Sequence, residues 1–328
     1  MSSSPPEPEV IKRLSEPIIE SMTMMAGVQL DVFSQLKDGP RSASQVAEAL
    51  HLDARKLGPL LYALVVVGLL TVEDGLFANT EEANHYMVRG RPGYMYTGFL
   101  IFGSTLTTAE TIRTGMPQSE HDYETMSPDE AQIFCENRHP VSVETGQTFA
   151  TEYDFSSCRS LIDVGGGSGG IAIAMAEAYP QLKATVVELA SVTPITQRYV
   201  DRSAARDRIQ VETVDVVKEP LTGSFDSAIL DHFIQILSPE DARQALSNLG
   251  QAIEPGGRIY IQGHIIDDSR LTPPDAVLAN MVFLNVYKTG QAYTEQEYRG
   301  WLTEAGFEDI EHVTEPESMN MILARKGG

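Results

Sequence analysis

Cysteine is nearly absent from this chain, with 2 residues among 328. Cys135 and Cys158 are too few for the disulfide framework of small secreted domains, and their spacing is not that of a metal-binding motif. The sequence therefore predicts no metal site and a protein of the reducing cytoplasm. The chain is long enough for two domains, or for one domain with an extension.

Basic residues are also scarce, since 24 lysines and arginines stand against 46 acidic residues and leave a formal net charge of −22. Such an excess of negative charge repels phosphate backbones and anionic membranes. We therefore expect no nucleic-acid partner and no membrane partner.

Long apolar runs are missing too. The longest, residues 60–70, contains Gly68 and falls short of the roughly 20 residues that span a bilayer. Residues 1–9 lack the basic and apolar regions of a signal peptide and are expected to form a disordered tail.

The most distinctive stretch is a predicted strand, turn and helix that contains a cluster of glycines. An apolar run from Leu161 to Val164 leads into the turn, and an apolar segment that stops at Pro180 follows it. Glycine is required where the backbone takes positive φ or approaches a ligand, and the following helix presents unpaired N–H groups to the turn. We expect a nucleotide-like ligand in a cradle formed by Gly165, Gly166, Gly167 and Gly169.

The acid at the end of the next predicted strand narrows the choice of ligand. Glu188 lies about one strand–helix–strand unit beyond the glycines, where a carboxylate can accept hydrogen bonds from both ribose hydroxyls. A dinucleotide and S-adenosylmethionine (SAM) both satisfy this pattern. Asp163, directly before the glycines, favours SAM, because dinucleotide-binding folds often lack an acid there.

Strands and helices alternate over residues 156–328, which predicts a doubly wound parallel sheet with its ligand at the carboxyl ends of the strands. Thr193 and Ser238, each followed by proline, are expected to cap helices, and Thr294 with Glu297 forms a capping box. The expected strands are residues 161–164, 184–188, 209–214, 225–230, 258–266, 307–313 and 320–324.

The first hundred residues have a different pattern. Residues 10–36 are predicted to form one or two helices with a broad apolar face. This face could be buried against a second copy of the chain or within its own domain, and we favour the second copy. A capping box at Ser42, a helix over residues 54–67 and a hairpin with an Asp74-Gly75 turn together predict a winged helix. The second helix is mostly apolar, so DNA recognition is not expected.

Residues 92–152 are predicted to be mainly helical, with a break at Gly115, and rich in aromatic residues and methionine. Their place between the other two segments suits a cover over a substrate cleft. The predicted organisation is a tail (1–9), a winged-helix-like dimerisation domain (10–100), connecting helices over the cleft (101–155) and a ligand-binding domain (156–328).

The segment from Asp163 to Gly169, together with the turn from Glu254 to Ile259, resembles the plant-type O-methyltransferase family and its bacterial relatives. The resemblance extends over nearly the whole chain. It implies an all-α winged-helix dimerisation domain, a Rossmann-like class I domain, a homodimer, SAM as methyl donor, S-adenosylhomocysteine as its product and a small-molecule acceptor. Beyond the glycines, the implied cofactor contacts are Asp163, Glu188, Leu189, Asp215, Val216 and Asp231.

The family's catalytic histidine is replaced here. Alignment through the following residues 237–240 puts Gln235 at that position, and glutamine can orient a substrate but cannot act as a base. Three explanations stay open. His264 or His139 could be the base; the acceptor atom could be nitrogen, carbon or sulfur and need no base, with Gln235 as a positioning residue; or bound SAM could serve chemistry other than methylation.

The resemblance also implies residues for the acceptor. Arg138 and His139 fall on the family's substrate-facing helix, where they could hold a carboxylate. The full set of predicted acceptor contacts is Phe102, Met126, Arg138, His139, His232 and Asn285.

Overall fold

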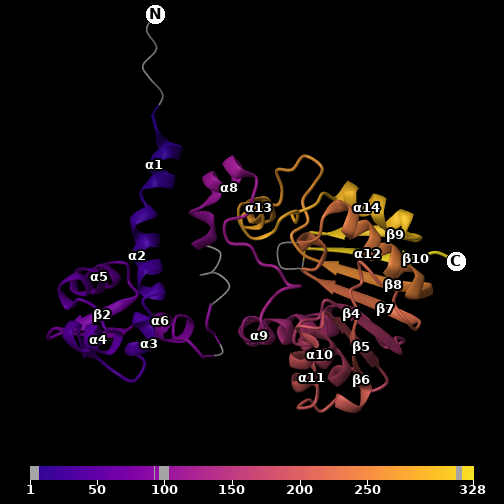
Figure 1. Ribbon diagram of the computed structural model, residues 1–328, viewed down its shortest axis with the longest axis horizontal. Helices are drawn as coiled ribbons and strands as arrows, with labels where there is room; N and C mark the ends of the chain where they lie inside the picture. Colours follow the sequence, from indigo (N-terminus) through magenta and orange to yellow (C-terminus); the bar gives the residue numbers. More distant parts are fainter. Residues whose placement is uncertain (1–6, 92, 96–102, 315–319) are drawn as a thin grey trace, which may run out of the picture. The chain divides into compact units, whose positions relative to one another are not determined.

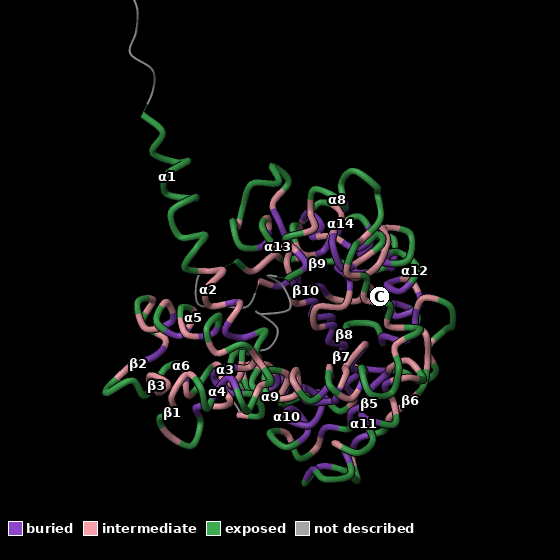
Figure 2. Tube along the Cα trace, turned by 60° about the vertical axis from the view of Figure 1, so that its left-hand side comes forward, coloured by how far each residue is buried: buried purple, intermediate pink, exposed green. Residues whose placement is uncertain are grey.

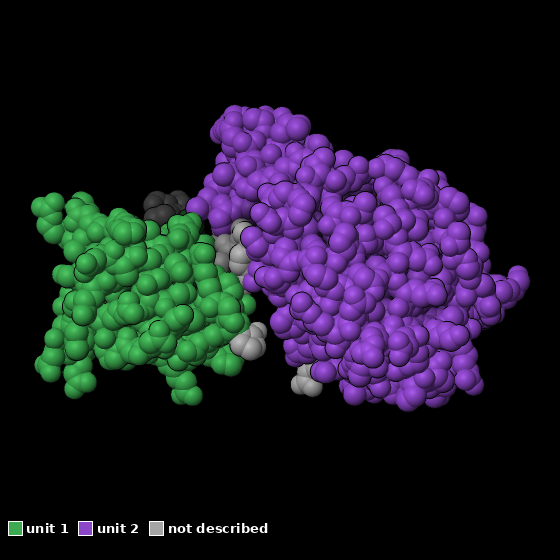
Figure 3. All heavy atoms as spheres, turned by 60° about the horizontal axis from the view of Figure 1, so that its bottom comes forward, with its two compact units in different colours: residues 1–102 green, residues 103–328 purple. Residues whose placement is uncertain are grey.

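The computed structural model describes residues 7–91, 93–95, 103–314 and 320–328 (Figure 1). It divides into two units, Met1–Phe102 and Gly103–Gly328, which are coloured separately in Figure 3. Each unit has its own hydrophobic core.

Unit 1 is mainly helical and packs its helices against a small antiparallel sheet with strand order β1-β3-β2, in which β2 and β3 form the predicted hairpin. Pro17 separates the first two helices, and Asp31, with φ of 58°, separates the second from the third, so residues 10–36 form three helices instead of one or two. The elements of this unit are α1 (Glu9–Ser15), α2 (Ile18–Gln29), α3 (Val32–Gln35), β1 (Arg41–Ser42), α4 (Ala43–Leu50), α5 (Ala54–Val66), β2 (Leu70–Glu73), β3 (Leu76–Asn79) and α6 (Glu81–Tyr86).

Local signals account for the centre of this unit. Ser42 and Gln45 form the predicted capping box at the start of α4. Asp74 and Gly75 have φ of 49° and 78°, as a tight hairpin turn between β2 and β3 requires. Helix α5 buries its leucines in the core of the unit, which explains its apolar sequence.

Unit 2 is built on a seven-stranded sheet with the order β6-β5-β4-β7-β8-β10-β9. The first five strands in this order are parallel, and β10 runs antiparallel to both of its neighbours. The strands are β4 (Ser160–Val164), β5 (Lys183–Glu188), β6 (Ile209–Thr213), β7 (Phe225–Asp231), β8 (Ile253–Gln262), β9 (Phe307–Val313) and β10 (Met321–Lys326).

Helices cover both faces of this sheet, and the buried residues concentrate between them (Figure 2). Alternate strand residues point to opposite faces, so Leu161 packs with α9 and α10 while Ile162 packs with α12 and α14. The helices are α8 (Thr108–Thr114), α9 (Pro128–Glu152), α10 (Gly170–Ala178), α11 (Thr193–Val200), α12 (Pro239–Ala252), α13 (Pro274–Val286) and α14 (Glu295–Glu304).

Two of the predicted boundaries are wrong. Thr193 does not cap α11, because the helix begins at that residue and its hydroxyl lies 3.0 Å from that of Thr213 instead. Strand β8 begins at Ile253, five residues earlier than expected. A register shift follows that first pairing, where Gly256 takes φ of 82°. The caps at Ser238 and Thr294 are confirmed.

None of the described helices is both long and apolar enough to cross a bilayer. Cys135 and Cys158 are free thiols and both are buried.

Candidate active site

Four acidic residues lie at the carboxyl ends of four neighbouring parallel strands, β6, β5, β4 and β7 (Figure 1). They therefore share one edge of the sheet. A glycine turn joins β4 to α10 at this edge, and three of its glycines have φ between 56° and 75°, a conformation that other residues rarely adopt. The four acids are Asp163, Glu188, Asp215 and Asp231.

Asp163 is fully buried, and its Oδ1 has no hydrogen-bond partner. Its Oδ2 accepts a hydrogen bond from the backbone N–H of Ala172 at 3.3 Å. Burial and then the negative charge of Asp231 raise the pKa of Asp163 to about 7. A buried, half-satisfied acid is unfavourable by itself, and a cationic group beside Oδ1 would remove that penalty.

Two positions of the glycine turn, Gly165 and Gly166, have no room for a side chain. A Cβ on Gly166 would lie 2.7 Å from Cγ of Asp163, and one on Gly165 would lie 2.6 Å from the ring of Phe233. The N–H of Gly167 donates to Oε1 of Glu188 at 3.0 Å. Burial raises the pKa of Glu188, although hydrogen bonds to its carboxylate oppose the shift. Glu188 therefore ties the turn to the end of β5.

Asp215 has local partners. Its Oδ1 accepts from the N–H of Val217 at 3.0 Å, and its Oδ2 forms an ion pair with Lys218 at 2.9 Å. The side chain of Val216 is buried in the core. A hollow of about 230 Å³ nevertheless opens beside Asp215 and Leu189. Its remaining lining comes from Glu124, Ala190, Ser191, Thr213 and Glu219.

A charged cluster lies where β7 ends. Nδ1 of His232 is 2.7 Å from Oδ1 of Asp231, and Nη2 of Arg138 is 3.8 Å from Oδ2. Burial works to raise the pKa of Asp231, but the neighbouring His232 and Arg138 outweigh it and lower that pKa. The Arg138 side chain is only 25% exposed and reaches from α9 to Asp231, while its expected contact with a carboxylate acceptor stays a prediction.

Gln235 is buried next to this cluster, and its Oε1 accepts from the backbone N–H of His264 at 2.9 Å. The glutamine thus holds the chain that follows β8. Burial, reinforced by His232, lowers the pKa of His264 to about 4, so this imidazole is neutral at pH 7.

Aromatic rings extend from His264 along one wall of the site. Phe283 follows at 5.3 Å between ring centroids, and Tyr287 follows Phe283 at 5.6 Å. The hydroxyls of Tyr287 and Tyr123 are 3.4 Å apart. Burial raises the pKa of both tyrosines. Sequence reasoning missed Tyr123, whose only signal is its place in the aromatic segment before α9.

Two family models match the chain: an O-methyltransferase domain over residues 111–308 and an O-methyltransferase dimerisation domain over residues 13–89. The chain belongs to the O-methyltransferase family. Members of this family depend on SAM, so this chain is a SAM-dependent methyltransferase.

Relatives differ in the atom that their names give as the acceptor. The 3-hydroxy-5-methyl-1-naphthoate 3-O-methyltransferase of Streptomyces sahachiroi is 28% identical over 95% of this chain and 94% of its own. The L-tyrosine C(3)-methyltransferase of Streptomyces lavendulae is 26% identical over 86% and 82%. The structure of human N-acetylserotonin methyltransferase in complex with SAM is 25% identical, matches all of both chains and has a TM-score of 0.79.

The site fits SAM on its own geometry. Asp163 offers an unpaired buried oxygen to a positive charge, and the turn would exclude any larger residue at Gly165 or Gly166. Within the described residues, no cluster of histidine, cysteine and carboxylate side chains could hold a metal ion.

Three predicted site residues have other partners in the structure. Nδ1 of His139 lies 2.8 Å from the hydroxyl of Ser168 and its ring stacks on Tyr199, so it supports the glycine turn. Met126 packs into a small core beneath α9. The Asn285 amide joins α13 to the α8 region through its hydrogen bonds.

Asn285 is fully buried. Its amide nitrogen donates to Thr108 at 2.8 Å, and its amide oxygen accepts from Thr111 at 2.7 Å and from Thr107 at 3.2 Å. No polar group of this side chain is left for an acceptor, so the expected substrate contact is not found. Phe102 lies outside the described residues.

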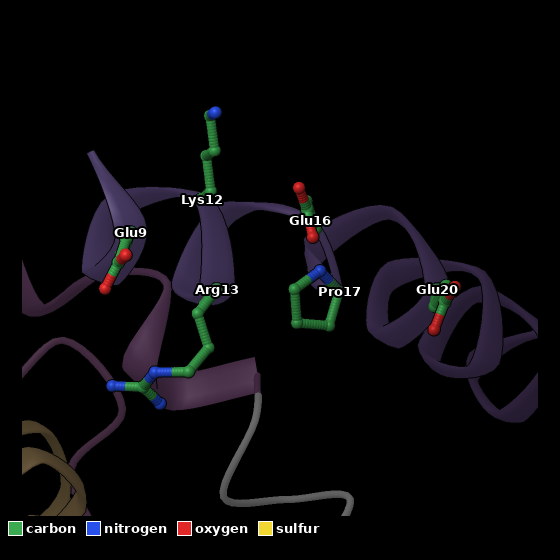
Figure 4. Close-up of a pocket in the computed structure, with 6 residues that line it drawn as sticks. All are labelled: Glu9, Lys12, Arg13, Glu16, Pro17 and Glu20. Carbon is green, nitrogen blue, oxygen red and sulfur yellow. The ribbon is translucent and has the colours of Figure 1, made fainter. Parts of the chain in front are cut away.

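A separate surface hollow occurs in unit 1, where Pro17 separates α1 from α2 (Figure 4). In Figure 4 Lys12 and Glu16 point to one side of the helices and Glu9 and Arg13 to the other, and none of the strand-end acids belongs to this unit. Its lining consists of Glu9, Lys12, Arg13, Glu16, Pro17 and Glu20. We assign it no chemistry.

Proposed function

We propose that this chain transfers a methyl group from SAM to a small, planar aromatic acceptor bound at the carboxyl end of β7. The main observation behind the proposal is that two groups of residues lie at the same edge of the sheet. One is the buried carboxyl of Asp163 at the glycine turn, whose Oδ1 has no hydrogen-bond partner. The other is the Asp231, His232 and Arg138 cluster, which begins on the adjacent strand.

On the donor side, Asp163 would hold the positively charged methionine end, and Glu188 would accept hydrogen bonds from the ribose. The hollow beside Leu189 and Asp215 offers space for the adenine. SAM supplies a methyl group activated by its sulfonium. The task of the protein is to bind both partners, align them and exclude water.

On the acceptor side, Phe283, which is 6% exposed, and Tyr287 continue a row of aromatic contacts from the histidines at the ends of β7 and β8. Aromatic side chains recognise planar rings by stacking and edge contacts. The naphthoate, tyrosine and acetylserotonin in the names of the relatives all contain aromatic rings, which supports this acceptor class.

We further propose that the chain forms a homodimer through its first helices. Helix α1 has no buried residue, and large apolar side chains on α1 and the start of α2 are more than half exposed. Contiguous apolar surface of this kind marks an interface. The residues are Val10, Ile11, Leu14, Ile18 and Ile19. Sedimentation of Ile11→Glu/Ile19→Glu should show a monomer, whereas an unchanged dimer would place the interface elsewhere.

Calorimetry with SAM and S-adenosylhomocysteine tests the donor site. We expect both to bind the wild-type protein and both to bind Glu188→Ala more weakly. Labelled SAM, offered with phenols, aromatic carboxylates, thioethers and heteroaromatic nitrogens, then tests the reaction. Failure to bind SAM would overturn the proposed function, and transfer only to non-aromatic acceptors would overturn the acceptor class.

A further inference from the structure

We propose that His232 is the general base of this enzyme, an inference that rests on the proposed function. The methyl acceptor is then a hydroxyl group that is not ionised in solution. His232 lies three residues before Gln235, and Gln235 occupies the position of the family's catalytic histidine. Asp231 serves His232 as a positioning residue.

The first support is the hydrogen bond between the two side chains. Oδ1 of Asp231 can only accept when the carboxyl is ionised, so the 2.7 Å contact requires the proton of the imidazole to lie on Nδ1. The lone pair of a neutral imidazole is then on Nε2. A carboxylate that fixes the tautomer in this way also stabilises the imidazolium formed when Nε2 takes a proton.

The second support is access. The side chain of His232 is 33% exposed and that of Asp231 is 11% exposed, so the imidazole is the more accessible member of the pair. His264, the other histidine nearby, packs its ring against those of His232 and Phe283.

The third support is the backbone. His232 has φ of 54°, in the left-handed region that is unfavourable for most side chains, and its N–H donates to the carbonyl of Gln262 at 2.9 Å. Strained residues of this type persist where the surrounding structure enforces them and are frequent at active sites. The strain lies directly after β7, whose neighbour β4 carries Asp163.

The titratable and charged groups around the Asp231–His232 pair come from three other elements. They are Arg138 on α9, His264 after β8, which is neutral at pH 7, and Asp163 on β4, whose charge interacts with that of Asp231. Arg138 pairs with the far oxygen of Asp231 and leaves the near oxygen to His232. The ionised carboxylate of Asp231 therefore lies between the Arg138 cation and the His232 imidazole, which accepts the proton.

The proposed step balances as follows. An oxygen lone pair of the acceptor forms the new bond to the methyl carbon, and the electron pair of the broken carbon–sulfur bond stays on sulfur, which becomes a neutral thioether. The hydroxyl proton passes to Nε2 of His232 and afterwards to solvent. The positive charge therefore moves from sulfur to the imidazolium, next to Asp231.

One test needs no acceptor. Nitrogen-15 spectra of the histidine-labelled protein, compared with those of His232→Asn to assign the signal, should show His232 at pH 8 with its proton on Nδ1. Asp231→Asn should remove that preference. Asparagine is the right replacement at residue 232 because it tolerates left-handed backbone. A proton on Nε2 in the wild-type protein would overturn the proposal.

The second test uses substituted phenols and hydroxynaphthoates whose hydroxyl groups are either ionised or un-ionised at the assay pH. A general base contributes about 100- to 10,000-fold, so His232→Asn should lower kcat/KM by at least about 100-fold for un-ionised acceptors and much less for ionised ones. The matched control, His264→Asn, should show no such difference.

Calorimetry separates this proposal from the proposed function. His232→Asn should bind S-adenosylhomocysteine as the wild-type protein does. The assignment of His232 would be overturned if His232→Asn lowered kcat/KM equally for ionised and un-ionised acceptors, or if the enzyme methylated no hydroxyl group at all. Neither result would contradict SAM binding. Loss of SAM binding in the wild-type protein would overturn the proposed function itself.

Discussion

The two halves of the proposed site, one for the methyl donor and one for the acceptor, are built in different ways. The donor half, at the ends of β4 and β5, is made from residues close in sequence: the glycine turn, Asp163 just before it and Glu188 at the end of the next strand. The acceptor half joins Arg138 from α9, Asp231 from β7 and Phe283 from α13. A methyl donor that is the same throughout a family permits a fixed local motif, whereas acceptors that differ require separate elements that can change independently.

Substitution of Asp163 should produce the largest effect and should confine it to the donor half. Asp163→Asn removes the charge but keeps the shape, and loss of one partner from a buried ion pair costs about 3–5 kcal/mol, or at least about 100-fold in affinity for SAM. Calorimetry measures it. The exposed Asp201→Asn is the control and should bind normally. A loss below tenfold would mean that Asp163 does not face a cation.

The pH dependence of stability and of SAM affinity tests the raised pKa of Asp163. Because the folded protein raises the pKa of Asp163 from 3.8 to about 7, the ligand-free protein binds this proton more tightly than the unfolded chain does. The contribution of Asp163 to stability is therefore present below pH 3.8 and is lost as the pH rises to about 7. Affinity for SAM should change in the opposite direction and fall below pH 7.

Thermal unfolding of the ligand-free protein between pH 4 and pH 8 measures the first effect. Asp163→Asn should have a flatter profile than the wild-type protein and should be the more stable of the two at pH 8. An identical slope in both proteins would contradict the raised pKa.

Asn285→Ala tests whether Asn285 stabilises the fold or contacts the methyl acceptor. The substitution leaves the buried hydroxyl of Thr111 without its 2.7 Å partner. An unsatisfied buried group costs about 1–3 kcal/mol, so the free energy of unfolding should fall by that amount while the affinity for SAM stays the same. Chemical denaturation provides the measurement. Unchanged stability with a raised KM for the acceptor would restore Asn285 as a substrate contact.

Phe283→Leu should give the smallest effect, limited to the acceptor. An aromatic contact is worth about 0.5–1.5 kcal/mol beyond its buried area, so KM for a planar acceptor should rise about two- to tenfold with little change in affinity for SAM. Steady-state kinetics at saturating SAM test this. Tyr62→Leu in unit 1 is the control, because its ring packs on Phe77 there.

The donor half could be predicted because each of its signals is local. A strand, a glycine turn and a helix follow one another in the sequence, and the acid at the end of the next strand lies at the same sheet edge by topology. Asp215 shows the limit of such reasoning, since its carboxylate is paired with Lys218 in the structure and its role toward adenine stays a prediction.

The acceptor half could not be predicted in the same way. Arg138 and Asp231 are far apart in the sequence, and no periodicity says that they form an ion pair. The same holds for Asn285, which looked like a pocket residue on its helix but uses its hydrogen bonds on Thr108 and Thr111. Buried polar groups are satisfied by whatever partner packing brings near, and packing is a long-range property.

The sequence by itself determined that this protein has a mainly parallel sheet in which a glycine turn joins β4 to α10, because backbone conformation, helix caps and strand ends depend on adjacent residues. Only the tertiary structure decided which histidine has a carboxylate partner. That pairing of Asp231 with His232, and the burial that keeps His264 neutral, depend on elements that meet only when the chain is folded.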